Sequence, residues 1–531
     1  MADQQNPQSV TLTIDGREVT VPKGTTILKA AEAVGIKIPH YCFHPGLSSP
    51  AMCRLCLVEV EGAPKLLPSC TSTVADGQVV RTDSEAAQAQ RTGVLEFYLV
   101  NHPLDCPICD QSGECKLQDY TFAEGREHGR GKEPKRVFGR DDFGGDVLFY
   151  GDRCVMCTRC VRFMREVAED ERLTVVERGN RSVIDTFFEE GLEGSPFACN
   201  IIDICPVGAL VSKDFLHKAR AWDLDHTPSV CSSCSQGCNI SLHTRDNLVQ
   251  RLKPRENLEV NGWWMCDYGR HNYEWMNRGD RLEVPLVDGT AMGWPEALRA
   301  ALEGLGEAGD GVKALVSPYA SNETMGLLKG LVEEVGGGEI LYRSPRADDE
   351  VPLPGFPTLV RRKDLAPNVK GAEIMGFRRV GEDDGRGGLE ELRDHDGILL
   401  VVGDELPDAG EDFGSGAALF LYLGQYPAPA TGNARFVLPS TNFTEQEGSW
   451  TNVQGRIQRF WQGRKAPGAA RPAWMILGAL LAELTEGEAP VRADQAFARA
   501  AERVSEFDGI TYRDIGTRGV LVKEPASLSG D

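Results

Sequence analysis

The alternation of hydrophobic and polar residues changes its period several times along the chain. Residues 9–22, SVTLTIDGREVTVP, alternate with period two on both sides of an Asp-Gly pair, which predicts two strands joined by a tight turn. A helix is expected to follow over about 25–34, with Gly35 as its C-cap. Residues 85–101, EAAQAQRTGVLEFYLVN, repeat apolar positions with the period of a helix and predict an amphipathic one.

Residues beyond about 281 follow a different pattern. The runs ILLVV and LFLYL are continuously apolar, which is typical of parallel strands buried on both faces. VKALVSPYAS followed by NETMGLLKGLVEEVGGG predicts a strand, a turn, a helix and a glycine cap. An α/β domain is therefore expected over 281–531, and its apolar run 473–482 predicts a buried helix too short to span a bilayer. The proline-rich stretch 346–373 has few periodic features, and we interpret it as an extended arm against a partner subunit.

Composition narrows the functional classes. The chain has 531 residues and a net charge of −22, which disfavours nucleic acid as a partner because phosphates require a basic face. The N-terminal stretch has neither the basic nor the apolar region of a signal peptide. We therefore expect a soluble protein of the cytoplasm that can dock on a membrane complex. We find no GxGxxG motif after a strand, no P-loop and no catalytic triad, so no substrate chemistry of its own is expected.

Cysteine usage is the most informative feature. All sixteen cysteines lie between residues 42 and 266. Without a secretion signal, cysteines in CxxC units indicate metal or cluster ligands rather than disulfides, which leaves zinc or iron–sulfur. Their spacing defines four groups. Group one is Cys42, Cys53, Cys56 and Cys70; group two is Cys106, Cys109 and Cys115; group three is Cys154, Cys157, Cys160 and Cys205; group four is Cys231, Cys234, Cys238 and Cys266.

Group one follows the predicted hairpin and helix. This strand–strand–helix–cysteine-loop order resembles the β-grasp fold of [2Fe–2S] ferredoxins, although its first loop is longer than in the plant pattern. His44 is interpreted as a loop residue, because a Rieske motif would need a second histidine where Cys56 stands. Arg54 either offsets the negative charge of a cluster or is a solvated surface arginine.

Group three joins a C-x2-C-x2-C run to a distant Cys-Pro, which resembles bacterial ferredoxins. The positions that would complete a second cluster hold Met164, Ser195, Ala198 and Ile201. One [4Fe–4S] cluster is therefore expected. Cys199 is off register for any cluster position, and we interpret it as a small buried hydrophobic residue.

Group four has the spacing C-x2-C-x3-C-x27-C. It resembles the [4Fe–4S] motif at the start of molybdopterin oxidoreductases, while a zinc ribbon, which more often shows two CxxC knuckles, is the alternative. The later EGSWTN segment also resembles that class. However, no cysteine follows Cys266, and Tyr268 stands where the catalytic enzymes often have lysine. We therefore expect the C-terminal region to be a non-catalytic scaffold.

Group two is one ligand short. With Cys199 set aside, the other three groups use twelve of fifteen cysteines, which leaves three for a cubane that needs four ligands. His102, four positions before Cys106, is the candidate for the missing ligand. The alternative is a surface histidine beside a three-cysteine cluster.

The four groups in this succession resemble the large iron–sulfur subunit of respiratory complex I, the NADH–quinone oxidoreductase. The most specific segments are NHPLDCPICDQSGEC at 101–115 and CNIIDICPVGAL at 199–210, and the resemblance is strong over 9–280. It implies that His102 is a [4Fe–4S] ligand. It also implies that electrons pass from group one to group three and then to group two, with group four off the main path.

The resemblance further implies the partners and the location. A flavin-containing NADH-oxidising subunit would deliver electrons, and quinone-proximal and two-cluster ferredoxin subunits would receive them. The assembly would be the peripheral arm of a membrane complex, on the cytoplasmic side of the inner membrane. One [2Fe–2S] and three [4Fe–4S] clusters, with neither flavin nor molybdopterin, are expected in this chain.

A multidomain chain of α+β and α/β parts is therefore predicted. Its parts are a β-grasp [2Fe–2S] ferredoxin domain at 1–85, a one-histidine/three-cysteine [4Fe–4S] segment at 86–130, a ferredoxin-like [4Fe–4S] domain at 131–220, a [4Fe–4S] module of molybdopterin-oxidoreductase type at 221–280 and a non-catalytic α/β domain of the same type at 281–531. An iron-only hydrogenase would need further cysteines after residue 266. A zinc-stapled interaction protein is the alternative of a different class, and iron and sulfide analysis distinguishes it.

Overall fold

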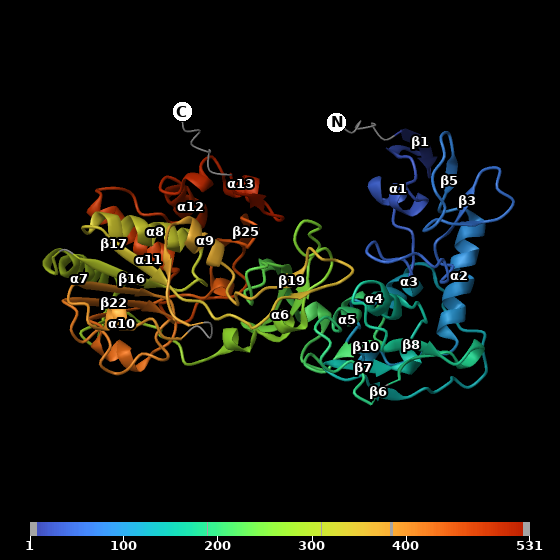
Figure 1. Cartoon of the computed structure of the whole chain (residues 1–531). Helices are drawn as coiled ribbons and strands as arrows, with labels where there is room; N and C mark the ends of the chain where they lie inside the picture. The colour runs from blue at the N-terminus through green and yellow to red at the C-terminus, as the bar shows by residue number, and fades with distance from the viewer. Residues whose placement is uncertain (1–7, 188, 310, 383–385, 524–531) are drawn as a thin grey trace. The chain divides into compact units, whose positions relative to one another are not determined.

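The computed structural model describes residues 8–187, 189–309, 311–382 and 386–523. Contacts between Cα atoms divide the chain into a first unit, Met1–Asp223, and a second unit, Leu224–Asp531. Figure 1 shows both units.

A five-stranded sheet opens the first unit, in the order β2-β1-β5-β3-β4. The predicted hairpin is present, and the left-handed backbone at Asp15 and Gly16 (φ 46° and 79°) forms its turn. Helix α1 (Ile27–Ala33) begins at the N-cap Thr26 and buries Leu28 against the sheet. The strands are β1 (Ser9–Ile14), β2 (Arg17–Pro22), β3 (Leu57–Val60), β4 (Leu67–Pro68) and β5 (Val79–Arg81).

The predicted amphipathic helix is α2 (Glu85–Leu99), which starts at the side-chain cap of Ser84. It runs from this sheet towards the rest of the first unit (Figure 1). Helix α3 (Lys116–Glu124) packs against it, and Arg91 of α2 is buried in an ion pair with Glu124 of α3.

The remainder of the first unit consists of short elements. A three-stranded sheet, a two-stranded sheet and two helices surround the cysteines of group three. The elements are β6 (Arg140–Asp142), β7 (Val147–Tyr150), α4 (Arg159–Glu166), β8 (Leu173–Val176), β9 (Val183–Thr186), α5 (Asn200–Ile204) and β10 (Leu210–Ser212). Because these elements are short, the loops between them supply much of the packing.

The second unit begins with an antiparallel sheet of three strands. The strands are β11 (Asp225–Val230), β12 (Asn239–Arg245) and β13 (Leu248–Pro254), followed by α6 (Asp267–His271). Three cysteines of group four lie in the loop between β11 and β12, and the fourth is the N-cap of α6.

An eight-stranded sheet forms the centre of the second unit, in the order β15-β14-β23-β22-β21-β16-β17-β20. From β23 to β20 all neighbours are parallel, and the chain order of these six strands is that of a doubly wound sheet. The strands are β14 (Leu286–Val287), β15 (Thr290–Ala291), β16 (Val312–Val316), β17 (Gly338–Tyr342), β20 (Arg378–Arg379), β21 (Ile398–Val402), β22 (Leu419–Gly424) and β23 (Phe436–Pro439).

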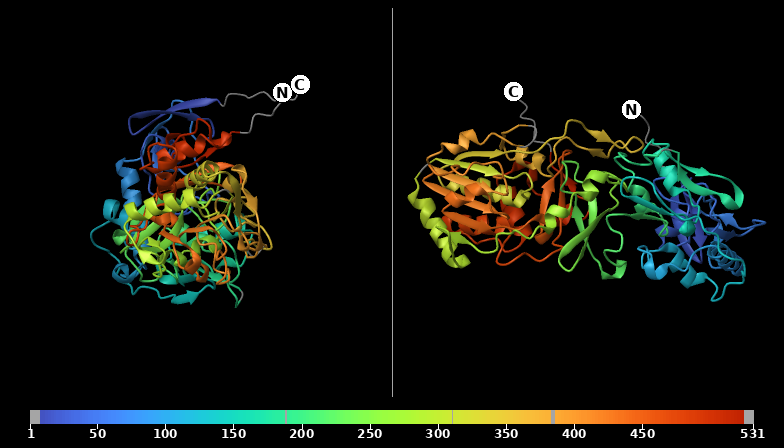
Figure 2. Two further views of the ribbon diagram at one scale, coloured as in Figure 1. Left: turned by 90° about the vertical axis from the view of Figure 1, so that its left-hand side faces the viewer. Right: turned by 90° about the horizontal axis from the view of Figure 1, so that it is seen from below.

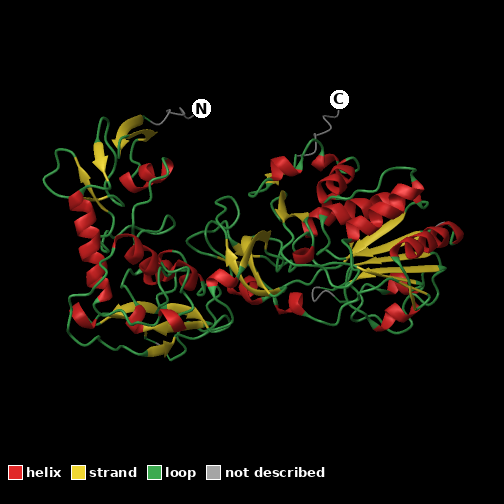
Figure 3. Cartoon of the chain, turned by 180° about the vertical axis from the view of Figure 1, so that it is seen from behind, coloured by secondary structure: helices red, strands yellow, loops and turns green. Residues whose placement is uncertain are grey.

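Both faces of this sheet are covered, as the continuous apolar runs predicted. Leu400 and Val402 of β21 pack in one hydrophobic cluster, whereas Leu399 and Val401 pack in another, because successive side chains point to opposite faces. Figures 2 and 3 show helices on either side of the strands. The helices are α7 (Trp294–Glu307), α8 (Asn322–Glu334), α9 (Val369–Ile374), α10 (Glu390–Arg393), α11 (Ala473–Leu484), α12 (Ala493–Ala501) and α13 (Tyr512–Ile515).

Five further strands form two small sheets, one of two strands (β18-β19) and one of three (β24-β25-β26). They are β18 (Val351–Pro352), β19 (Val360–Arg361), β24 (Gly448–Thr451), β25 (Arg456–Phe460) and β26 (Val520–Leu521). The apolar run at 473–482 forms the buried helix α11, as predicted. Among the described residues, no helix has both the length and the apolar character that a membrane span requires.

Candidate metal centres

Cys56 and Cys70 of group one pack in the same hydrophobic cluster as α1 and the five-stranded sheet, and all four thiols of the group are at most 2% exposed. They form two hydrogen-bonded pairs, Cys42 with Cys53 and Cys56 with Cys70. These bonds lower the pKa of Cys53 to about 5 and that of Cys56 to about 7 and raise the pKa of their partners. The backbone N–H of Tyr41 lies 3.5 Å from Cys53 Sγ, which further favours a thiolate there. The structure therefore brings the four predicted ligands together.

Group two is less enclosed. Cys115 is the N-cap of α3 and Cys109 follows a short 3-10 helix; both are buried, whereas Cys106 is exposed. Burial raises the pKa of Cys109, and the nearby guanidinium of Arg153 opposes that rise.

His102 lies next to the same guanidinium. Burial and, secondly, the charge of Arg153 lower the pKa of His102 to about 4, so its imidazole is neutral at pH 7, as metal ligation requires. Neither ring nitrogen has a hydrogen-bond partner among the described residues. His102 and Cys109 thus share one neighbour, and the ligand role of His102 stays a prediction.

Groups two and three meet at the loop that follows Cys205. The backbone N–H of Lys116 donates to the Pro206 carbonyl at 3.0 Å. A Cβ atom on Gly208 would lie 2.2 Å from the Sγ of Cys109, so any side chain at position 208 would displace that thiol. The glycine of the CPVGAL segment therefore allows the two groups to approach each other.

Group three surrounds a small cavity lined by all four of its cysteines. The loop bends around this cavity through left-handed backbone at Met156 and Thr158 (φ 50° and 57°). Burial raises the pKa of each of the four thiols. Arg159 also lines the cavity, and its Nε is buried without a hydrogen-bond partner among the described residues. Four thiols and an unsatisfied cationic donor fit an anionic cluster better than an empty space.

Group four is also enclosed, with all four thiols at 4–5% exposure. The Cys231 N–H donates to the Cys238 carbonyl at 2.8 Å, and Gly269 N–H donates to Cys266 Sγ at 3.3 Å. A Cβ on Gly269 would lie 3.0 Å from the Sγ of Cys231, so the start of α6 approaches two of the thiols closely. Burial raises the pKa of Cys231 to about 11, and a metal would offset this cost of burying thiolates.

The proline-rich arm returns to its own chain. Ser235 N–H donates to the Asp364 carbonyl, and Gln236 bonds both the Thr358 carbonyl and the Arg362 guanidinium, each at 2.9 Å. The arm therefore covers the cysteine loop of group four, which its irregular composition did not reveal. A contact of the arm with a partner subunit stays a prediction.

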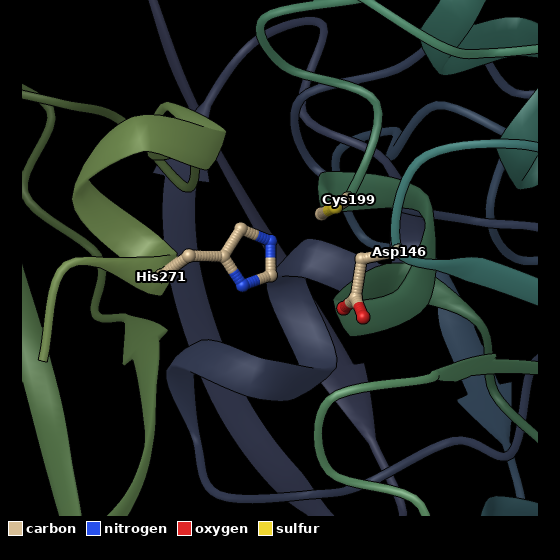
Figure 4. Close-up of side chains that lie close together, drawn as sticks. All are labelled: Asp146, Cys199 and His271. Carbon is tan, nitrogen blue, oxygen red and sulfur yellow. The ribbon is translucent and has the colours of Figure 1, made fainter. Parts of the chain in front are cut away.

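Cys199 is buried, at 3% exposure, as expected of an off-register cysteine. Its surroundings are not purely apolar, because its Sγ lies within 4.8 Å of a carboxylate oxygen of Asp146 (Figure 4). Arg54 is exposed on left-handed backbone, which agrees with the solvated alternative.

Sequence reasoning missed the arginines of group three. Arg153, Arg159 and Arg162 are 3–4% exposed and alternate with the cysteines in RCVMCTRCVR. That alternation was the available signal, since arginine is seldom fully buried without a partner.

Sequence reasoning also missed a cavity of about 280 Å³ at the carboxyl ends of β16, β21, β22 and β23. Its lining includes Ser317, Asp404, Gln425 and Ser440, each of which follows one of these strands. This is the position at which doubly wound sheets offer a binding site.

Five family models match the chain. They are the 2Fe-2S iron-sulfur cluster binding domain at 7–85, the NADH-ubiquinone oxidoreductase-G iron-sulfur binding region at 91–130, the ferredoxin-like domain of NADH-quinone oxidoreductase subunit 3 at 144–211, the Molybdopterin oxidoreductase Fe4S4 domain at 224–278 and Molybdopterin oxidoreductase at 421–483.

A curated relative decides the family. The mitochondrial NADH-ubiquinone oxidoreductase 78 kDa subunit of Candida albicans is 31% identical over 602 aligned residues, which cover 90% of this chain and 83% of the relative. The chain belongs to the family of the large iron–sulfur subunit of NADH–quinone oxidoreductases. The predicted family and fold class are therefore confirmed, and iron–sulfur domains of both the 2Fe-2S and the 4Fe-4S type are present.

Bacterial members of the family are longer. The NADH-quinone oxidoreductase G subunit of Rickettsia bellii is 40% identical over 62% of this chain and 48% of its own length, and that of Streptomyces coelicolor is 44% identical over 56% and 36%. The matched part of this chain thus covers about half of the length of the first relative and less than half of the second. A crystal structure titled NAD+-reducing [NiFe]-hydrogenase in the H2-reduced state is 32% identical over 40% of this chain and 91% of its own chain. Its TM-score is 0.37, which is too low to support an argument about the fold. The five-part division of the chain and the individual ligands stay predictions.

Proposed function

We propose that this iron–sulfur protein carries electrons in series through the sites of groups one, three and two, within an NADH–quinone oxidoreductase. Group one would hold a [2Fe–2S] cluster, and groups two, three and four would each hold a [4Fe–4S] cluster, with His102 as the fourth ligand of group two. When bound, such clusters supply one-electron carriers whose potentials depend on ligand type, burial and hydrogen bonds to sulfur.

The observation that carries the proposal is that group three contacts both of the other two groups through residues beside its ligands. The guanidinium of Arg162 on α4 donates to the carbonyl of Cys42, a group one ligand, at 2.5 Å. On the other side, the Pro206–Gly208 loop of group three contacts Lys116 and Cys109 of the group two segment. Group three therefore contacts both other groups, and the group one loop also reaches the group two segment, where His40 N–H donates to the Tyr120 hydroxyl at 3.4 Å. Direct contact between ligand loops keeps successive sites close, which serial electron transfer requires.

The protein's own residues exclude water from most of these sites. The thiols of groups one and four, together with Cys157 and Cys160 of group three, are at most 8% exposed, so little solvent reaches them. Cys106 differs because it is exposed, which places the edge of group two at the protein surface. An exposed edge at the end of the series is suited to the exchange of electrons with another protein.

The partners follow from the family. We infer that a flavin-containing NADH-oxidising subunit delivers electrons, and that quinone-proximal and two-cluster ferredoxin subunits receive them in the peripheral arm on the cytoplasmic side of the inner membrane. Group four, enclosed by the arm in the second unit, would lie off this path. Relatives that are subunits of NADH-quinone or NADH-ubiquinone oxidoreductases support a place for this chain in such an assembly.

Anaerobic purification with iron and acid-labile sulfide analysis tests the proposal. About 14 iron atoms per chain are expected, from one [2Fe–2S] and three [4Fe–4S] clusters. Low-temperature EPR of the dithionite-reduced chain should resolve both cluster types, and a flavoprotein should copurify from the native source. Stoichiometric zinc without visible absorbance would overturn the proposal in favour of a zinc-stapled interaction protein.

A further inference from the structure

Two of the three arginines of group three are buried cations without a carboxylate counter-ion. Among the described residues, Arg153 has Asp105 within salt-bridge distance, whereas Arg159 and Arg162 have no carboxylate within 4 Å, and the charge of Glu166 reaches Arg162 only from beyond that distance. All three are 3–4% exposed. A buried guanidinium without an anion is strongly unfavourable, so an anion is expected beside these side chains.

Arg162 connects group three to group one. Its guanidinium donates to the carbonyls of Cys42, at 2.5 Å, and of Ser48, both in the group one loop. The same group donates to the carbonyl of Cys157 at 3.3 Å. One side chain therefore holds the backbone of a ligand from each group.

Arg159 makes a similar connection. It donates to the carbonyl of Phe43, next to the ligand Cys42, and to that of Ile204 at 3.1 Å, next to the ligand Cys205. Its Nε has no partner among the described residues and lies in the lining of the group three cavity.

Arg153 connects group three to group two instead. Its Nε donates to a carboxylate oxygen of Asp105 at 2.9 Å, and another of its nitrogens approaches the Gly208 carbonyl at 3.4 Å. Its guanidinium carbon lies 3.9 Å from the ring centre of Tyr150, which fixes its direction. Gly208 in turn touches Cys109, so Arg153 lies where the two groups meet.

We propose that these arginines are positioning residues shared between neighbouring clusters: Arg159 and Arg162 couple group three to group one, and Arg153 couples group three to group two. This inference rests on the proposed function, since it requires clusters in groups one to three. An electron that arrives at either site of a pair adds one negative charge, and a shared buried cation stabilises that charge at both sites. Each arginine therefore raises the reduction potentials of one specific pair of clusters.

The test compares Arg153→Gln and Arg162→Gln in the full chain, prepared anaerobically, by EPR-monitored redox titration. Arg165→Gln is the matched control, because Arg165 is on the same helix but its side chain is 58% exposed. Arg153→Gln is expected to weaken reduction of the group two and group three clusters about tenfold, which is 59 mV for a one-electron couple, and to leave the group one cluster unchanged. Arg162→Gln is expected to shift groups one and three and to leave group two unchanged. Arg165→Gln should shift none.

Lysine variants are the control in case the glutamine variants lose their clusters. Arg153→Lys and Arg162→Lys keep the charge but not the planar fork of donors, so we expect full iron content and smaller shifts in the same pairs. Shifts of all clusters alike, shifts in the wrong pair, or no shift in any arginine variant of full iron content would overturn the inference. A wild-type chain without iron would instead overturn the proposed function.

Discussion

The five-stranded sheet of the first unit and the eight-stranded sheet of the second unit relate differently to the cysteines. Under the five-stranded sheet, Cys56 and Cys70 belong to the hydrophobic core itself. The two hydrophobic clusters on the eight-stranded sheet contain no cysteine among the described residues, and group four lies in a loop of a separate small sheet. The first unit thus places two of its candidate ligands inside a hydrophobic core, whereas the two clusters on the large sheet of the second unit contain none.

This difference suggests that metal binding and folding are coupled to different degrees. In the first unit the elements around group three are short, and buried thiols and arginines occupy positions that an apolar core would otherwise fill. Burying free thiols and guanidinium groups without a counter-ion costs free energy. Binding of the clusters should therefore supply much of the folding free energy of the first unit. The second unit buries two large apolar clusters that contain no cysteine among the described residues, so we expect its folding to depend less on metal binding.

Removal of iron should have the largest effect on stability, and it should destabilise the first unit more than the second. Chelation of the full chain is expected to make the first unit sensitive to limited proteolysis, while a fragment that begins near Leu224 and contains the large sheet persists. Mass spectrometry of the fragments with time provides the measurement. Equal digestion of both units after chelation would contradict the comparison.

Gly208→Ala should abolish one cluster. The added Cβ would lie 2.2 Å from Cys109 Sγ, so we expect the loss of about four iron atoms and of the group two EPR signal. Gly269→Ala in the second unit should have a milder effect, because the nearest thiol would lie at 3.0 Å.

Gly93→Ala is the control, since a Cβ on Gly93 in α2 meets no atom within 4 Å. It should raise stability by about 0.5–1 kcal/mol and leave the iron content unchanged. Full iron content in Gly208→Ala would show that the junction of groups two and three is less tightly packed than the structure indicates.

His102→Ala tests the ligand that spacing alone left open. We expect the signal of one cubane to change or disappear in low-temperature EPR, with the other three clusters intact. His102→Cys should retain the cluster at a lower potential, because a thiolate adds the negative charge that imidazole lacks. An unchanged spectrum and iron count in His102→Ala would reject the ligand role.

Leu331→Ala should have the smallest effect on the clusters. Leu331 is fully buried on α8 in the second unit, so its truncation is expected to lower the free energy of unfolding of that unit by about 2–5 kcal/mol. Denaturant unfolding followed by circular dichroism measures the loss, and the EPR spectra of groups one to three should not change. A loss of iron from those groups would show that the units do not fold independently.

Local features of the fold could be predicted from the sequence. The hairpin turn at Asp15, the cap of α1 at Thr26 and the buried strand β21 depend on residues within a few positions of one another. The cysteine spacing likewise defined the four candidate groups, of which short runs such as Cys154–Cys160 are the local part, and their ligand roles stay predictions. Family resemblance added the expected role of His102.

Only the tertiary structure decided which groups are neighbours. The contacts of Arg162 with Cys42 and of Arg153 with Gly208 join residues 120 and 55 positions apart, and the return of the arm to Gln236 spans more than a hundred. Periodicity and spacing carry no information about such pairings, because they depend on how complete elements pack. The sequence by itself therefore determined the local elements and the cysteine spacing from which the ligands are predicted, and packing between distant segments determined which cysteine groups are neighbours and which buried cations lie between them.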